Sequence, residues 1–110
     1  MAYRVALASS DGIVVNRHFG KADTFLVFEQ RNNDFEYIEK RMVTPCCVGG
    51  KHADSGFDEA ARTLSDCSAV VVGKIGAGAA DYLNARGFEV YEAPFPVSAV
   101  LKELVRERGI

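Results

Sequence analysis

The hydrophobic pattern of this 110-residue chain changes its period once, and this change constrains the fold more than any other feature. Up to about residue 43, apolar side chains recur with a period of two, which is typical of strands. From residue 55 onward, helical spacing alternates with short apolar runs. The pattern therefore predicts strands first and then alternating helices and strands, which is an α/β arrangement.

The first half predicts four strands, and a turn sequence separates the first two. Ser10-Asp11-Gly12 favours a hairpin between them, and short turns favour antiparallel pairing. The predicted strands are residues 3–8, 13–15, 24–29 and 35–43.

The second half predicts strand–helix–strand units, which need right-handed crossovers and parallel pairing. The predicted elements are a helix from Ser55 through Leu64, a buried strand at 69–72, a helix to about Arg86 with Gly87 as a left-handed cap, a strand at 88–91 and a last helix from Val97. The expected architecture is one domain over residues 1–110. Its mixed sheet is of the five-stranded type, with helices packed on it, in the order β-β-β-β-α-β-α-β-α, in which short strands can merge.

The charge and the apolar runs exclude several partners. The net charge is −2 and the pI is about 5.6, which argues against nucleic acid as a partner. No apolar run approaches the roughly 18 residues of a membrane span, and the first residues do not resemble a signal peptide. We therefore expect a cytoplasmic protein with no membrane partner.

Three cysteines are present, an odd number that does not form a disulfide framework. Cys46 and Cys47 are adjacent, and in a reducing compartment they are free thiols available as ligands. Cys67 lies just before the apolar run 69–72, so we interpret it as a small buried residue.

The segment Arg17-His18-Phe19-Gly20 lies between two predicted strands. Phe19 can anchor this loop in the core while His18 points elsewhere, and Gly20 allows a close approach of the backbone. A neutral imidazole is a ligand for iron, zinc and copper. The alternative is a histidine that only hydrogen-bonds within the loop.

The segment 44–54 is the most irregular part of the chain. Thiolates bind soft metals and iron–sulfur clusters, and glycines admit a bulky ligand near the backbone. A lysine near thiols can lower their pKa and can offset anionic charge. The spacing matches no zinc or ferredoxin motif, so a bound cluster keeps open or externally supplied ligands; the alternative is a loop with incidental thiols. The candidate residues are Cys46, Cys47, Gly49, Gly50, Lys51 and His52.

Two further patterns give weaker signals. Gly73–Gly78 follows a strand and precedes a helix, but it matches neither a dinucleotide fingerprint nor a P-loop. Close helix-to-sheet packing is the favoured interpretation, with anion contact as a secondary role. The strand 3–8 carries no carboxylate, Asp11 lies in the following turn, and Ser9 has no evident base, so no hydrolase site is predicted.

Three segments carry a resemblance to a known family: 5–12 (Val-Ala-Leu-Ala-Ser-Ser-Asp-Gly), 18–22 (His-Phe-Gly-Lys-Ala) and 25–28 (Phe-Leu-Val-Phe). With the looser match of the Gly-rich segment and the last helix, nearly the whole chain resembles the NifB/NifX/NafY family, the dinitrogenase iron–molybdenum cofactor biosynthesis domain. This resemblance implies a ribonuclease H-like fold. The family's histidine in His-Phe-Gly, a candidate cofactor contact, corresponds to His18, and its Cys- and His-containing loop is matched to Cys46, Cys47 and His52.

The resemblance implies a non-catalytic protein that binds and carries an iron–sulfur or iron–molybdenum cofactor precursor. The expected metal ligands are His18, Cys46 and Cys47, and a cluster-assembly or acceptor protein is an expected partner. Such a cluster is anionic, so Arg17, Lys51 and loop amides complement its charge. Two alternatives stay open: a redox-sensing or partner-docking protein that uses the Cys46–Cys47 loop, and a metal-dependent nuclease-like enzyme that uses Asp11.

Overall fold

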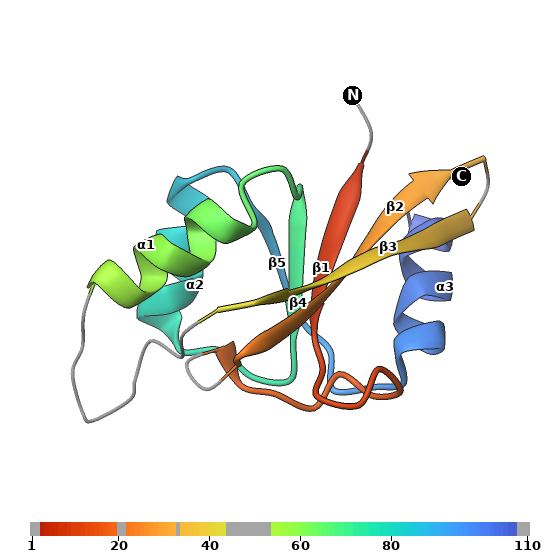
Figure 1. The fold of residues 1–110 in the computed structure, drawn as a ribbon, viewed down its shortest axis with the longest axis horizontal. Helices are drawn as coiled ribbons and strands as arrows, with labels where there is room; N and C mark the ends of the chain where they lie inside the picture. Colours follow the sequence, from red (N-terminus) through yellow and green to blue (C-terminus); the bar gives the residue numbers. More distant parts are fainter. Residues whose placement is uncertain (1–2, 20–21, 33, 44–53, 108–110) are drawn as a thin grey trace.

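The structure is a computed structural model that describes residues 3–19, 22–32, 34–43 and 54–107, and the side chains of these residues except 54–58. The elements, shown in Figure 1, are β1 (Arg4–Ala8), β2 (Thr24–Arg31), β3 (Asp34–Met42), α1 (Asp54–Thr63), β4 (Ala69–Val72), α2 (Ala77–Ala85), β5 (Glu89–Glu92) and α3 (Val97–Glu107). None of the described helices is long and apolar enough to cross a membrane.

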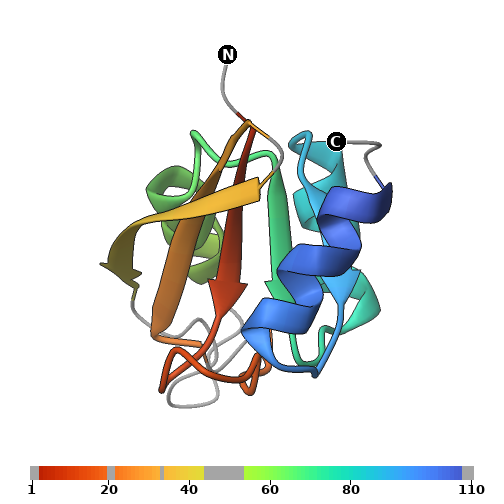
Figure 2. The same ribbon diagram turned by 90° about the vertical axis from the view of Figure 1, so that its right-hand side faces the viewer.

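The strands form one mixed sheet of five strands in the order β3-β2-β1-β4-β5. β1 pairs with β2, and β2 with β3, in antiparallel fashion, whereas β1–β4 and β4–β5 are parallel. Helices α1 and α2 cover one face and α3 covers the other, as Figures 1 and 2 show from two directions. The predicted five-stranded mixed sheet with packed helices is confirmed.

Alternating side chains of the central strands build two cores, one on each face of the sheet. In β1, Ala6 and Ala8 belong to the core under α1 and α2, whereas Val5 and Leu7 belong to the core under α3. All four residues of β4 are fully buried, as the apolar run 69–72 predicts. The central strands therefore form a rigid support for the loops at their ends.

The predicted strand at 13–15 is wrong, and so is its hairpin with the first strand. β1 pairs instead with β2, and Val14 forms only an isolated bridge with Pro96. The carboxylate of Asp11 accepts hydrogen bonds from the backbone N–H groups of Ile13 (2.8 Å) and Val14 (3.1 Å). These donors are therefore engaged by a side chain, which folds the segment as a turn in place of a strand.

The end of α2 follows the prediction from Gly87. Gly87 has a φ of +92°, its N–H donates to the carbonyl of Asn84, and the N–H of Phe88 donates to the carbonyl of Leu83. This pair of bonds is a Schellman motif, which glycine favours because it has no Cβ. The motif turns the chain directly into β5.

Ion pairs tie the amino-terminal end of β1 to β2 and β3. Arg4 bonds the carboxylate of Glu29, which is 7% exposed, at 2.7 Å, and also contacts Asp66. Arg41 bonds Asp66 through both terminal nitrogens, one at 2.8 Å. The hydrogen bonds from Arg41, reinforced by Arg4, hold the pKa of the Asp66 carboxyl well below its usual range.

We expect Asp66→Asn to destabilise the fold by about 1–2 kcal/mol at pH 7, because it weakens charge-assisted hydrogen bonds to two arginines. The effect is not larger because the side chain is partly exposed to solvent. Because the folded-state pKa of Asp66 is lowered, its contribution is present above the unfolded pKa, near 4, and is lost as the pH falls through the folded value. Urea unfolding from pH 7 to pH 2 should show a shallower acid loss in the variant. Asp81→Asn, at an exposed site on α2, is the control and should change little.

Candidate functional site

The end of the sheet at which β1 and β4 finish is here called the carboxyl edge. Because β2 runs antiparallel to β1, it begins at this edge, and β3, antiparallel to β2, ends there, with Thr24 opposite Met42. The segments that follow β1 and β4 therefore meet at one edge, as Figures 1 and 2 show.

The loop after β1 is fixed by its own hydrogen bonds. The Oγ of Ser9, fully buried, accepts from the N–H of Gly12 at 2.9 Å and donates to Asp11 at 3.2 Å. The side chain of Asn16 bonds both the hydroxyl (2.9 Å) and the N–H (3.1 Å) of Ser10. Hydrogen bonds from backbone N–H groups lower the pKa of the Asp11 carboxyl. The carboxylate therefore stays ionised and continues to accept the hydrogen bonds that hold the turn.

Beyond this loop, residues 15–19 run beside the two residues that follow β4. The N–H of Gly73 donates to the carbonyl of Arg17 at 2.8 Å, and the N–H of Phe19 donates to the carbonyl of Lys74 at 2.9 Å. A Cβ on Gly73 would lie 3.3 Å from the carbonyl oxygen of Arg17 and 3.5 Å from that of Val15. Glycine at position 73 therefore permits this close contact between two backbone segments.

Phe19 and His18 divide their roles as the sequence predicts. Phe19 is 3% exposed and lies against Phe25, with ring centroids 6.4 Å apart, so it anchors the loop in the core. His18 is exposed and forms a parallel bridge with Lys74. Paired residues of parallel segments project on the same side, so the side chains of His18 and Lys74 leave the backbone on the same side at this edge.

Most of the other predicted site residues lie outside the described residues: Gly20, Cys46, Cys47, Gly49, Gly50, Lys51 and His52. Arg17 is described and is exposed beside His18. The last described residue before Cys46 is Val43, whose N–H donates to the carbonyl of Asp23 at 3.0 Å. Val43 thus belongs to the carboxyl edge, where His18 also lies. Within the described ranges, no three His, Cys, Asp or Glu side chains form a metal-binding group.

The Gly-rich segment after β4 leads into a helix that packs on the sheet, as the favoured interpretation expects, although not every glycine takes part in close packing. Ala79 does pack against the core under α1 and α2, but a Cβ at Gly76 or Gly78 would meet nothing within 4 Å. The close contact is instead made by Gly73, against the loop before His18. The N–H of Ile75 donates to the carboxylate of Glu92 at 2.9 Å, so one amide of this segment already has an anionic partner from β5.

Sequence reasoning missed the place of Gly73 and Lys74 beside His18. The signal was present, since both directly follow the buried run 69–72 and so had to lie at the carboxyl end of a central strand. The hydrophobic pattern did not identify residues 15–19 as the segment that runs beside Gly73 and Lys74, because residues 15–19 have no regular period.

Cys67 is buried, as predicted, with 7% of its surface exposed. Burial raises the pKa of its thiol to about 12. At pH 8 such a thiol has about a thousandfold less thiolate than an ordinary cysteine. In a Cys46→Ser/Cys47→Ser variant we therefore expect Cys67 to resist iodoacetamide at pH 8 in the folded protein and to react fully in urea, as measured by mass spectrometry. Rapid labelling of the folded variant would contradict this assignment.

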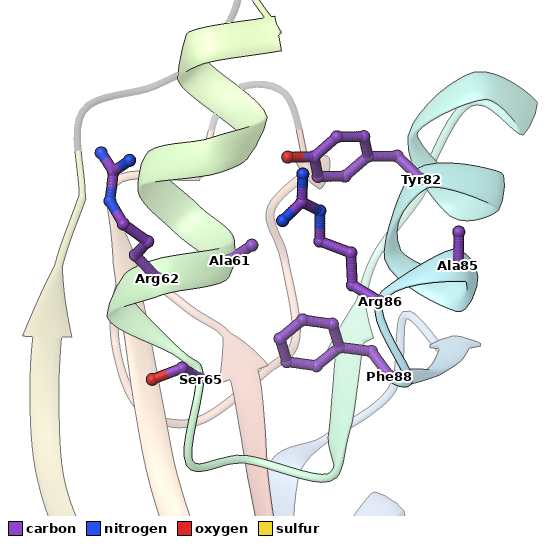
Figure 3. Close-up of a pocket in the computed structure, with 7 residues that line it drawn as sticks. All are labelled: Ala61, Arg62, Ser65, Tyr82, Ala85, Arg86 and Phe88. Carbon is purple, nitrogen blue, oxygen red and sulfur yellow. The ribbon is translucent and has the colours of Figure 1, made fainter.

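A cavity of about 690 Å³ lies between α1 and α2, away from these residues (Figure 3). Ala61, Tyr82 and Phe88 point toward the gap, and the guanidinium of Arg86 lies over the ring of Tyr82, 4.5 Å from its centroid. Ser65 and Phe88 precede β4 and β5, so the cavity is near the amino ends of these strands. It is therefore separate from the carboxyl edge.

The sequence profile of the family described as "Dinitrogenase iron-molybdenum cofactor" matches residues 1–107. The chain belongs to this family. It is 36% identical over 108 residues to the FeMo cofactor biosynthesis protein NifB of Frankia alni, and 33% identical over 106 residues to NifB of Herbaspirillum seropedicae. Each match covers 96% of this chain but only 20% and 19% of the relative, so the chain spans about a fifth of the length of these proteins.

Solved structures share the fold at low sequence identity. The crystal structure of PH0822 superposes with a TM-score of 0.71 at 23% identity, covering 94% of this chain and 91% of that one. The apo orange protein of Desulfovibrio gigas gives a TM-score of 0.66 at 19% identity, covering 98% and 91%. The sequence profile and the NifB relatives confirm the predicted membership in the dinitrogenase iron–molybdenum cofactor family, and the solved structures support the fold.

Proposed function

We propose that this member of the dinitrogenase iron–molybdenum cofactor family is a non-catalytic carrier. It holds an iron–sulfur or iron–molybdenum cofactor precursor as cargo at the carboxyl edge of its sheet. The observation that carries the proposal is the placement of His18: an exposed imidazole on a backbone segment that is held on both sides, by buried Phe19 and by bonds to residues 73 and 74.

Imidazole nitrogen is a suitable ligand for iron, and an exposed ligand is open to a cluster delivered by another protein. We propose that Cys46 and Cys47 supply thiolate ligands beside His18, and that His52, Gly20, Gly49 and Gly50 contribute to the same site. The support from the fold is that β3 ends with Met42 at the carboxyl edge, four residues before Cys46. In this proposal the cargo brings some of its own ligands, and the protein supplies only the rest. Such partial coordination suits a carrier, which must release what it binds.

Charge favours the same edge. Precursor clusters built from sulfide and thiolate are anionic, and a site for them needs compensating positive charge. Arg17 and Lys74 are both exposed here, one beside His18 in sequence and the other beside it across the parallel bridge. We propose that these two side chains, together with Lys51, stabilise the bound cargo.

The non-catalytic part of the proposal is supported by Asp11, on which a nuclease-like mechanism on this sheet would depend. Its Oδ1 accepts from two backbone N–H groups and from Ser9. These bonds give the carboxylate a structural role in the turn that leads to His18.

The assignment of the ribonuclease H-like fold also belongs to the proposal. It rests on the strand order β3-β2-β1-β4-β5, with β2 antiparallel to the parallel group formed by β1, β4 and β5. In such a sheet, ligands bind beyond the carboxyl ends of the parallel strands, which is where His18 lies.

Anaerobic reconstitution tests the proposal. Wild-type protein incubated with iron and sulfide, or with a preformed iron–sulfur cluster, should retain iron after desalting and show visible absorption from sulfide-to-iron charge transfer. Cys46→Ser/Cys47→Ser should lose at least about 90% of this retained iron, since thiolates are the preferred ligands of such clusters. Cys67→Ala, which removes a buried cysteine, is the matched control and should load normally. Equal loading of the double variant and the wild type would reject Cys46 and Cys47 as ligands.

A further inference from the structure

A second surface feature, a groove of about 410 Å³, lies between β5 and α3. β5 is at the edge of the sheet, so the groove is open on the side away from β4. Its apolar lining comes from Tyr91, Phe95, Val100 and Leu104, and Phe95 is 58% exposed. An apolar lining with an exposed phenylalanine at its end is typical of a site that buries apolar side chains of a partner.

The rim of this groove is acidic. Glu103 and Glu107 are four residues apart on α3, so they lie one above the other along the flank of the helix that faces the groove. Glu92 also lines the groove at the end of β5, but its carboxylate is engaged by the N–H of Ile75, so the acidic groups that the rim offers to a partner are those of α3. Arg106 contacts Glu103 at 3.6 Å, but both side chains are exposed, and such a pair is readily exchanged for another.

The groove is connected to the carboxyl edge by two hydrogen bonds. The carbonyl of Phe95 accepts from the N–H of Val15 at 3.0 Å, at the start of the segment that carries His18. The carboxylate of Glu92 accepts from the N–H of Ile75, next to Lys74. A protein seated in the groove would therefore lie next to the proposed cargo site.

We propose that this groove docks an amphipathic helix of a cargo donor or acceptor protein. The partner helix places an apolar face on Tyr91, Phe95 and Leu104. Lysine or arginine residues of the partner oppose Glu103 and Glu107. These two glutamates are one helical turn apart, which matches basic residues one turn apart on the partner. The inference rests on the proposed carrier function for the reason a partner must dock. A second copy of this chain fits poorly, because a two-fold contact through the groove would bring Glu103 and Glu107 of both copies together.

A synthetic peptide provides the test: 14 residues with leucine along one helical face, lysine elsewhere and a fluorescent label. Its matched control has glutamate in place of each lysine. We expect saturable binding of the lysine peptide to the wild-type protein by fluorescence anisotropy, and none of the glutamate peptide. Amide chemical shifts should move along β5 and α3.

Two variants at the groove and one elsewhere separate specific docking from general charge attraction. Glu103→Lys and Phe95→Ala should each weaken lysine-peptide binding by at least about fivefold, because one reverses a rim charge and the other removes an apolar contact. Asp81→Lys makes the same charge change as Glu103→Lys on α2, outside the groove, and should weaken binding by less than about twofold.

Absence of peptide binding, equal weakening by Asp81→Lys and Glu103→Lys, or shifts located away from β5 and α3 would each overturn the inference. A wild-type dimer that Phe95→Ala dissociates would overturn it in favour of a second copy. Cluster loading is measured on the same proteins: normal loading without peptide binding rejects the docking surface alone. Failure of the wild type to load rejects the carrier function, whatever the peptide does.

Discussion

Replacing His18 with alanine is expected to lower the affinity for an iron–sulfur cargo by at least roughly tenfold to a hundredfold. Changes beside a metal ligand already have effects of this size, and His18→Ala removes the proposed ligand itself. The fold should be unaffected, since the side chain is exposed and Phe19 still anchors the loop. The measurement is iron retained after anaerobic reconstitution, titrated against a chelator, with the circular dichroism spectrum as a check of folding.

His18→Cys distinguishes ligation from a structural role of the histidine. A thiolate is also an iron ligand, so this variant should regain most of the affinity that alanine loses, with an altered absorption spectrum. Lys102→Ala, at an exposed position on α3, is a control for the loss of an exposed basic side chain and should load normally. If the alanine, cysteine and wild-type proteins loaded equally, His18 would not be a ligand.

Gly73→Ala is expected to reduce cargo affinity about threefold to tenfold and to destabilise the fold by about 1–2 kcal/mol, as overpacking does. A Cβ at this position would press on backbone atoms of Arg17 and Val15, which cannot turn aside as a side chain can. The segment would shift by a few tenths of an ångström, and His18 and Lys74 would move apart. Reconstitution and urea unfolding measure the two effects.

Gly78→Ala is the matched control for Gly73→Ala. A Cβ at Gly78 would meet nothing within 4 Å, and the residue lies in α2, where alanine has the higher helix propensity. We expect this variant to gain about 0.5–1 kcal/mol of stability and to load cargo like the wild type. Destabilisation of the same size in both variants would show that the contact between residues 73 and 17 does not hold the site.

The sequence was informative wherever a residue's environment follows from its neighbours in the chain. The run 69–72 is apolar throughout and is buried on both faces, and Gly87 ends α2 with the positive φ that glycine favours. The division of roles between Phe19 and His18 was equally local.

The failures arose where a side chain or a distant segment decided the structure. Residues 13–15 have strand-forming side chains, but the N–H groups of Ile13 and Val14 donate to the Asp11 carboxylate. A hydrophobic pattern contains no information on this competition between a side chain and a neighbouring strand. Gly73 and Lys74 acquire their place only when β4 is set beside β1, which is a long-range contact. The candidate site could therefore be predicted as a histidine on a loop, but the residues that lie beside this histidine across the sheet could not.

The central claim is that the imidazole of His18 ligates the cargo at the carboxyl edge, and pulsed electron paramagnetic resonance tests it most directly. Protein carrying ¹⁵N-labelled histidine is loaded with an iron–sulfur cluster and reduced to a paramagnetic state. We predict a ¹⁵N hyperfine coupling of a directly bound nitrogen that is absent from the loaded His18→Cys variant and retained in His52→Ala. A loaded wild-type protein without such a coupling, or one whose coupling persists in His18→Cys, would contradict the claim.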